Sequence, residues 1–331
     1  MHSLQGFTHH PGAHCGSTAL NNLARFYGHP LTEPLCFGIG EGMGFMTVVL
    51  PGRSPSHLAM GRNPFLEERF FHNLGIPFQW AQSPDAKEAW RAAREAIDRN
   101  APVLLKTDLH YLPYYHSKTH FSGHVVVLTG YDEQGGKAIL SDTHFETLQT
   151  VSIDELAQAR KSRHPPNPLE NHFHIVERFP IPDDLAPVLC RAIAHQAKSM
   201  IEPLDYGAAK AGVPGMEHLA RTFGEWAQAP DWSWCARFAY QIIERRGTGG
   251  GNFRRLYARF LAEAESRLPG KGLSELSARM EDIADRWTDL ATHLKEVSEA
   301  EEPAGFAAAG ERMAAIASAE RAYYTAALAF A

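Results

Sequence analysis

Three side chains that lie far apart in the sequence together have the chemistry of a nucleophilic enzyme: Cys15, His124 and Asp142. A cysteine attacks as its thiolate, so it needs a lowered pKa, access to a substrate and a histidine that moves its proton. A carboxylate that holds the imidazole in the correct tautomer completes such a triad. We therefore predict that Cys15 is the nucleophile, that His124 is the base and that Asp142 orients the imidazole.

Cys15 lies where a glycine-containing segment, residues 12–16, meets a predicted helix over residues 17–27. Unpaired N–H groups and partial positive charge at a helix N-terminus stabilise a thiolate. The backbone N–H of Cys15 is also a candidate donor to an oxyanion. The candidates for a second oxyanion donor are Gln5, His9, His10 and His14.

His124 and Asp142 are predicted to meet at one end of a β-hairpin. An apolar strand over residues 125–131 and a strand over 137–142 are joined by a glycine-rich turn at 132–136. In an antiparallel hairpin, the start of one strand and the end of the next are neighbours within about two residues of register. The carboxylate therefore has the position that an orienting group needs.

The elements that carry these residues indicate a mixed α and β region followed by a helical one. In the first region, helices are predicted over residues 17–27, 65–73, 86–99 and 154–160, and strands over 102–106, 125–131, 137–142, 147–152 and 172–178. After a proline-containing linker, helices are predicted over residues 185–202, 215–227, 231–246, 252–267, 272–297 and 304–330. We predict an α+β domain with an antiparallel sheet over residues 1–180 and an all-α domain over 185–331, which packs on the first or forms a homodimer contact.

The composition excludes several classes of protein. The 331 residues carry a net charge of −6 without a basic stripe, which argues against nucleic-acid binding. No apolar run approaches the ~18–20 residues of a membrane span, and no leader precedes the domain, so a cytoplasmic protein is expected. Four scattered cysteines without C-x-x-C spacing argue against disulfides and against a zinc knuckle.

Two glycine-rich segments are candidates for substrate binding. Residues 37–45 alternate glycine with larger side chains but lack the Lys-Ser/Thr ending of a P-loop, so we interpret them as a flexible cleft wall. Within them, Glu41 and Gly42 are candidates to contact a cationic acceptor. The loop at 247–251 precedes a helix whose first turns contain arginines, and this pattern is typical either of a phosphate or carrier-protein site or of a plain helix connection. The arginines concerned are Arg254 and Arg255.

No metal is expected. His110, His116, His120 and His124 are spaced so that a helix would align three of them, but the Leu-Pro-Tyr-Tyr sequence at 112–115 argues against a helix there. No H-E-x-x-H motif occurs.

Longer motifs extend the argument beyond single residues. The arrangement resembles the papain-like cysteine peptidases, in particular the double-glycine leader peptidases. It is more similar to the N-terminal domain of the butirosin biosynthesis protein H family. The segments that carry this resemblance are HCGSTALNNLARFYG, FGIGEGMGF, LPYY, HFSGHVVVLTGYDE and SDTHFETLQTVSIDELAQAR. GTGGGNFRRLYARFLAEA resembles the helical domain that commonly follows it.

The resemblance implies a papain-like fold and acyl transfer in secondary metabolism. Cys15 would accept an acyl or aminoacyl group from the phosphopantetheine thioester of an acyl carrier protein, and an amine would then take it as an amide. No diffusible cofactor is implied. Papain-like enzymes place a glutamine a few residues before the cysteine as an oxyanion donor, and Gln5 is farther away than that pattern requires.

Two alternatives remain open on the sequence. A cysteine peptidase or amidase would use the same triad and differ only in delivering water to the acyl-enzyme. A binding module that keeps the fold would show no unusual thiol reactivity.

Overall fold

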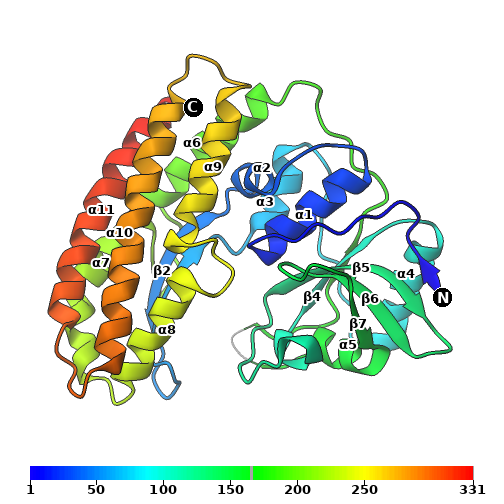
Figure 1. The fold of residues 1–331 in the computed structure, drawn as a ribbon, viewed down its shortest axis with the longest axis horizontal. Coiled ribbons are helices and arrows are strands. Elements are labelled where there is room, and N and C mark those ends of the chain that lie inside the picture. Colours follow the sequence, from blue (N-terminus) through cyan, green and yellow to red (C-terminus); the bar gives the residue numbers. More distant parts are fainter. Residues whose placement is uncertain (165–166, 331) are drawn as a thin grey trace. The chain divides into compact units, whose positions relative to one another are not determined.

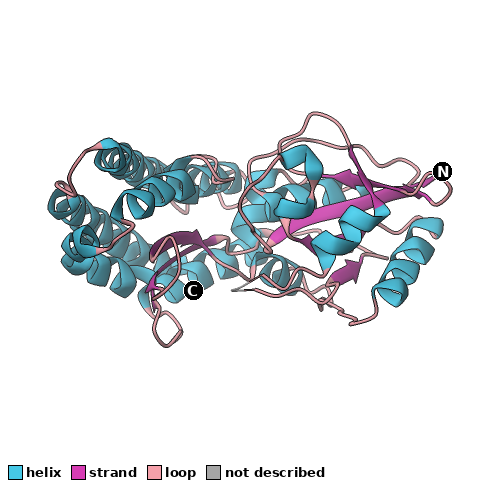
Figure 2. Cartoon of the chain, turned by 90° about the horizontal axis from the view of Figure 1, so that it is seen from below, coloured by secondary structure: helices cyan, strands magenta, loops and turns pink. Residues whose placement is uncertain are grey.

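The computed structural model describes residues 1–164 and 167–330, drawn in Figure 1. The chain divides into two compact units, one formed by residues 1–36 and 74–182 and the other by residues 37–73 and those from 183 onward. The first unit is α+β with an antiparallel sheet, and the second is mostly helical, as Figure 2 shows by colour. The predicted fold class is therefore confirmed.

The sheet of the first unit has the strand order β7-β6-β5-β4-β8, and β1 also pairs with β5. Every pairing in it is antiparallel. The strands are β1 (His2–Ser3), β4 (Val103–Thr107), β5 (His124–Asp132), β6 (Lys137–Ser141), β7 (Gln149–Ser152) and β8 (Phe173–Ile175). The central strand β5 is buried along almost its whole length, because its continuous apolar run has neighbours on both faces.

The helices of this unit begin and end close to where their periodicity predicts. They are α1 (Cys15–Phe26), α4 (Ala86–Asp98) and α5 (Ile153–Arg160), with short 3₁₀ turns η1 (Leu109–Tyr111) and η2 (Pro113–Tyr115). Asp85 caps α4 by accepting a hydrogen bond from the N–H of Lys87 at 2.8 Å. Both α1 and α4 pack against β5, so the helix that starts with Cys15 is seated on the strand that starts with His124.

The second unit combines helices with a small antiparallel sheet of order β3-β2-β9. Its helices are α3 (Leu66–Asn73), α6 (Ala186–Ile201), α7 (Gly212–Thr222), α8 (Trp232–Glu244), α9 (Arg254–Glu265), α10 (Leu273–Glu299) and α11 (Phe306–Ala327), with 3₁₀ turns η3 (Phe223–Gln228), η4 (Gly251–Phe253) and η5 (Leu328–Phe330). Its strands are β2 (Met43–Val49), β3 (His57–Arg62) and β9 (Lys210–Ala211). Five of the six predicted C-terminal ranges match α6, α8, α9, α10 and α11 to within three residues, whereas the helix predicted over 215–227 is α7 followed by η3.

One segment behaves differently from the prediction. Residues 37–73 were expected within the first domain, with 37–45 as a flexible wall, but they form the end of α2 (Glu33–Ile39), two strands and α3, and they cluster with the C-terminal helices. The physical reason is aromatic packing and strand pairing. Phe37 stacks on Phe253, and β2 pairs with β9 of the C-terminal part. The helical unit is thus not purely α.

Candidate active site

Cys15 is the first residue of α1, and His14 is its N-cap. The thiol therefore lies beside the first N–H groups of the helix, which have no carbonyl one turn earlier to bond. The residue is buried, with 7% of its surface exposed. The sulfur thus lies in a largely dry environment, where electrostatic interactions are stronger than in water.

His124 and Asp142 meet where the hairpin register predicts. Val127 pairs with Ser141, so Asp142 directly follows β6 beside the start of β5. His124 Nε2 lies 2.9 Å from Oδ1 and 3.0 Å from Oδ2 of Asp142, and both side chains are buried. Because Nε2 bonds to the carboxylate, Nδ1 is the ring nitrogen left for Cys15, whose side chain hydrogen-bonds to His124. The structure thus brings the three predicted residues together.

The charges around the sulfur favour a thiolate–imidazolium pair. Burial alone would raise the pKa of the Cys15 thiol, but the electrostatic influence of the His14 ring and hydrogen bonds from His124 and His14 hold it well below its usual range. Burial alone would likewise lower the pKa of His124, but the Asp142 carboxylate and the Cys15 thiolate raise it to about 10. Both shifts favour a proton on the imidazole and a negative charge on the sulfur.

Two tyrosines that the sequence analysis did not assign to the site hold the carboxylate. The Tyr114 hydroxyl donates to Oδ2 of Asp142 at 2.7 Å, and the Tyr115 hydroxyl donates to Oδ1 at 3.0 Å. Thr143 Oγ1 adds a third donor at 2.9 Å. His124, and then Tyr114 and Thr143, hold the pKa of Asp142 below its usual range despite burial. The only sequence signal was the motif LPYY at residues 112–115, which carries the family resemblance.

His14 is the one oxyanion candidate among the upstream side chains that contacts the thiol. Its Nδ1 accepts the backbone N–H of Ser17 at 3.3 Å, which leaves Nε2–H as the donor of the ring. Nε2 lies 4.0 Å from Cys15 Sγ. The ring therefore directs an N–H donor towards the sulfur.

The other upstream candidates are engaged elsewhere. His9 uses both ring nitrogens, on Ser141 Oγ and on the carbonyl of Phe145. Gln5 is a wrong candidate: it is exposed, and its side-chain amide donates to the carbonyl of Ser3.

The distance along the sheet explains why Gln5 cannot serve. Ser3 pairs with Gly130, six residues beyond His124 on β5, and six residues of strand span about 20 Å. Gln5 follows this pairing by two residues, and its backbone N–H donates to Asn100 Oδ1 at 2.7 Å, so the residue is held away from the start of β5.

The predicted substrate residues at 41 and 42 belong to the second unit and are packed inside it. Glu41 is buried, accepts the Asn73 amide at 2.9 Å and lies 3.5 Å from His195. A side chain at Gly42 would collide with the ring of Phe37. Glycine is thus required at 42 for close packing, and neither residue presents an open binding surface in this unit.

The prediction for Arg254 is also corrected. Arg254 is fully buried and forms two 2.8 Å hydrogen bonds with the carboxylate of Glu320, while its third nitrogen donates to backbone carbonyls. Arg255 lies at the surface of α9 and pairs with Glu281 and Asp285. Since carboxylates already neutralise both guanidinium groups, these arginines do not form an open phosphate site.

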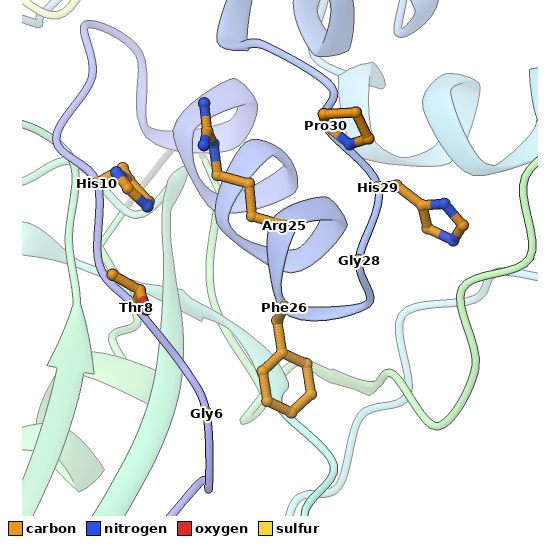
Figure 3. Close-up of a pocket in the computed structure, with 8 residues that line it drawn as sticks. All are labelled: Gly6, Thr8, His10, Arg25, Phe26, Gly28, His29 and Pro30. Atoms are coloured by element: carbon orange, nitrogen blue, oxygen red, sulfur yellow. The ribbon is translucent and has the colours of Figure 1, made fainter.

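A separate cleft lies at the other end of α1 (Figure 3). Its volume is about 330 Å³, and its lining comprises Gly6, Thr8, His10, Arg25, Phe26, Gly28, His29 and Pro30. Arg25 comes ten residues after Cys15 on the same helix, a rise of about 15 Å. The cleft is therefore distinct from the thiol site. His10 lines this cleft, and burial and the charge of Arg25 lower the pKa of its imidazole.

The histidines of the loop before β5 are held by one another and by a buried carboxylate. His120 Nδ1 lies 2.7 Å from Asp108, and its ring stacks on that of His164 and packs at a tilt against that of His110. Within residues 1–164 and 167–330, no three His, Cys, Asp or Glu side chains are arranged to hold a metal ion.

A buried cysteine at a helix N-terminus, with a histidine and a carboxylate from adjacent antiparallel strands, defines a papain-like α+β domain. Two family models match the chain: butirosin biosynthesis protein H, N-terminal, over residues 14–143, and a domain of unknown function, DUF4872, over residues 154–327, more than half of the chain. The DUF4872 model covers more than half of the chain, so the chain belongs to the DUF4872 family, and residues 14–143 before it match the N-terminal domain of butirosin biosynthesis protein H. No curated protein matches it. Among the helices that the structure describes, none has the length and apolar character to cross a bilayer.

Proposed function

We propose that this protein is a cysteine-dependent acyltransferase that moves an acyl or aminoacyl group from an acyl-carrier thioester to an amine. The observation that supports this most is the sulfur of Cys15 at the start of α1, hydrogen-bonded to an imidazole that Asp142 orients at 2.9 Å. The family description names butirosin biosynthesis, which supports a role in making a natural product.

In the proposed reaction, His124 donates and accepts every proton that is transferred. The Cys15 thiolate attacks the thioester carbonyl carbon, and the His124 imidazolium then protonates the departing pantetheine sulfur. The resulting enzyme thioester is attacked by the amine, and the neutral imidazole accepts the proton that the nitrogen loses. Collapse of the second tetrahedral intermediate breaks the C–S bond and restores the thiolate–imidazolium pair.

The oxyanion of both intermediates would be stabilised by two donors from the same segment. They are the backbone N–H of Cys15 at the helix N-terminus and Nε2–H of His14. In this proposal His14 replaces the glutamine that papain-like enzymes use.

The low exposure of Cys15 favours transfer over hydrolysis. With 7% of the residue exposed, bulk water has little access to an acyl group on the sulfur, whereas a bound amine would be delivered directly to it. The proposal requires no metal or diffusible cofactor, since the pantetheine arm arrives on the donor protein.

Intact mass spectrometry with acyl-carrier thioesters tests the proposal. We expect an acyl adduct on the full-length protein, no adduct on Cys15→Ser, and conversion to an amide when an amine is added. An adduct that releases only free acid would instead identify a hydrolase of the peptidase or amidase type. If no thioester in a panel of acyl and aminoacyl carriers gives an adduct, the acyltransferase proposal is wrong.

A further inference from the structure

The segment that leads into α1 is held by a carboxylate that no motif singled out. Glu33, the first residue of α2, lies 18 residues after Cys15. Its Oε1 accepts from Ala13 N at 3.1 Å, His14 N at 2.8 Å, Ser17 Oγ at 2.9 Å and Thr18 Oγ1 at 3.1 Å, and its Oε2 accepts from Ala13 N at 2.9 Å. One side chain thus receives four donor groups from six consecutive residues centred on the thiol.

We propose that Glu33 is a positioning residue that fixes the nucleophile and its flanking imidazole, and thereby sets the reactivity of Cys15. This inference rests on the proposed role of Cys15 as the nucleophile. Glu33 holds residues on both sides of Cys15. It acts through the backbone of His14, whose ring lies 4.0 Å from Sγ, and through Ser17, which bonds to that same ring.

The geometry around Gly12 supports the same conclusion independently. A Cβ at position 12 would lie 2.7 Å from Glu33 Oε2 and would collide with Thr18 Oγ1, so this carboxylate occupies the space that a side chain would need. On its other side, Gly12 N donates to the carbonyl of Thr143 at 2.8 Å. Thr143 in turn donates to Asp142. The segment from 12 to 14 is therefore clamped between Glu33 and the neighbour of the orienting carboxylate.

The backbone that leads into Glu33 is also fixed to α1. The amide of Asn21 donates to the carbonyl of Leu31, two residues before Glu33. The loop between α1 and α2 is thus anchored to the helix that it serves. Holding a reactive group by packed, hydrogen-bonded neighbours is what lets an active site keep productive geometry at no cost during reaction.

The two carboxylate oxygens of Glu33 accept different numbers of hydrogen bonds, and this difference allows two variants to be compared. Because Oε1 accepts from all four donor groups and Oε2 only from Ala13, glutamine with its carbonyl oxygen in the Oε1 position can keep the four bonds there and loses only the bond at Oε2, where its NH2 group faces the Ala13 N–H. Glu33→Gln should therefore preserve the segment, whereas Glu33→Ala removes every bond. The comparison separates positioning from the presence of a negative charge.

The test is the pH dependence of Cys15 alkylation by iodoacetamide, followed by intact mass on the full-length protein. We expect Glu33→Ala to move the midpoint upward towards the free-thiol pKa of about 8.5, and to slow alkylation at pH 6.5 roughly tenfold or more. Glu33→Gln should follow the wild type. Glu88→Ala, which removes a first-turn carboxylate of α4 bonded to Ser83, is the matched control and should leave the profile unchanged.

Each outcome decides the matter. An unchanged midpoint in a folded Glu33→Ala variant, or a lower melting temperature with the wild-type midpoint, overturns the proposal and leaves Glu33 a purely structural group. Should Glu33→Ala fail to fold, Thr18→Val removes one of the four donors while keeping the side-chain shape, and it must raise the midpoint for the proposal to stand. A wild-type protein whose thiol reacts only with a midpoint near 8.5 would instead reject the proposed function at its first step.

Discussion

Replacing Asp142 with asparagine is the most direct test of the proposed charge relationship. The substitution keeps the size of the side chain but removes its charge, and asparagine has only one oxygen with which to accept hydrogen bonds. Asp142 is 1% exposed, so water cannot take over the lost role. His124 would then keep its burial and lose its counter-charge.

The size of the expected effect follows from the pKa of the His124 imidazole. The difference between the pKa of about 10 for His124 and the ordinary value of about 6.5 corresponds to about 5 kcal/mol in favour of the protonated ring. Without Asp142, burial dominates and the pKa of His124 falls below neutrality, so no cation faces the sulfur from that side. If the Cys15 thiol then titrates near 8.5, about 1% of it is thiolate at pH 6.5, and alkylation should slow by up to about 100-fold.

The assay is the alkylation rate of Cys15 between pH 4 and 10, with each time point resolved by intact mass. The wild type should react at a rate that is nearly constant from pH 6 to 8, while Asp142→Asn should show a rate that rises throughout this range. The same variant should lose acyl transfer, since the reaction needs the proton on the ring.

Tyr114→Phe provides the matched control, because it removes one donor to Asp142 at 2.7 Å and leaves the charge in place. We expect it to shift the alkylation midpoint by less than about one pH unit. An Asp142→Asn variant that alkylates at pH 6 as fast as the wild type would refute the argument that the carboxylate maintains the ion pair.

Two further predictions concern stability. The pKa of His124 is about 10 in the folded state and about 6.5 in an unfolded chain, so its stabilising contribution is complete below about pH 6.5 and is lost as pH rises through about 10. Melting temperatures of the wild type should therefore fall between pH 8 and 10 more steeply than those of His124→Phe. Glu320→Ala leaves the buried Arg254 charge unpaired and should cost about 3–5 kcal/mol in chemical denaturation, whereas wild-type stability would show that the pair contributes nothing.

The helix of Cys15 and the hairpin of His124 were predictable because their signals are local. An apolar stripe and a glycine stop identify α1, and a long apolar run with a glycine-rich turn identifies β5 and β6. The register of a short hairpin then places Asp142 beside His124 without further information. To predict the positions of these residues, only one contact between distant parts of the chain was required, the packing of α1 on β5.

The partners of these groups were not predictable, because their signals depend on contacts across long stretches of sequence. Tyr115 reaches Asp142 from 27 residues away, and Glu33 reaches the segment before α1 from the start of α2. Neither has a spacing that distinguishes it from ordinary core or surface residues. Arg254 shows the converse, since a glycine-rich loop before a helix suggests an anion site, and only the fold reveals Glu320 beside it.

The surroundings of Asp142 also determine which group can carry the proton during the proposed reaction. Tyr114 and Tyr115 have their pKa values raised, first by burial and then by the charge of Asp142, so both remain neutral donors throughout the range in which the thiolate exists. The carboxylate, with its own pKa lowered, does not take the proton either. A proton leaving the thiol therefore stays on His124, where it is available to the departing sulfur, and the tyrosine hydroxyls keep the base in place without competing for its proton.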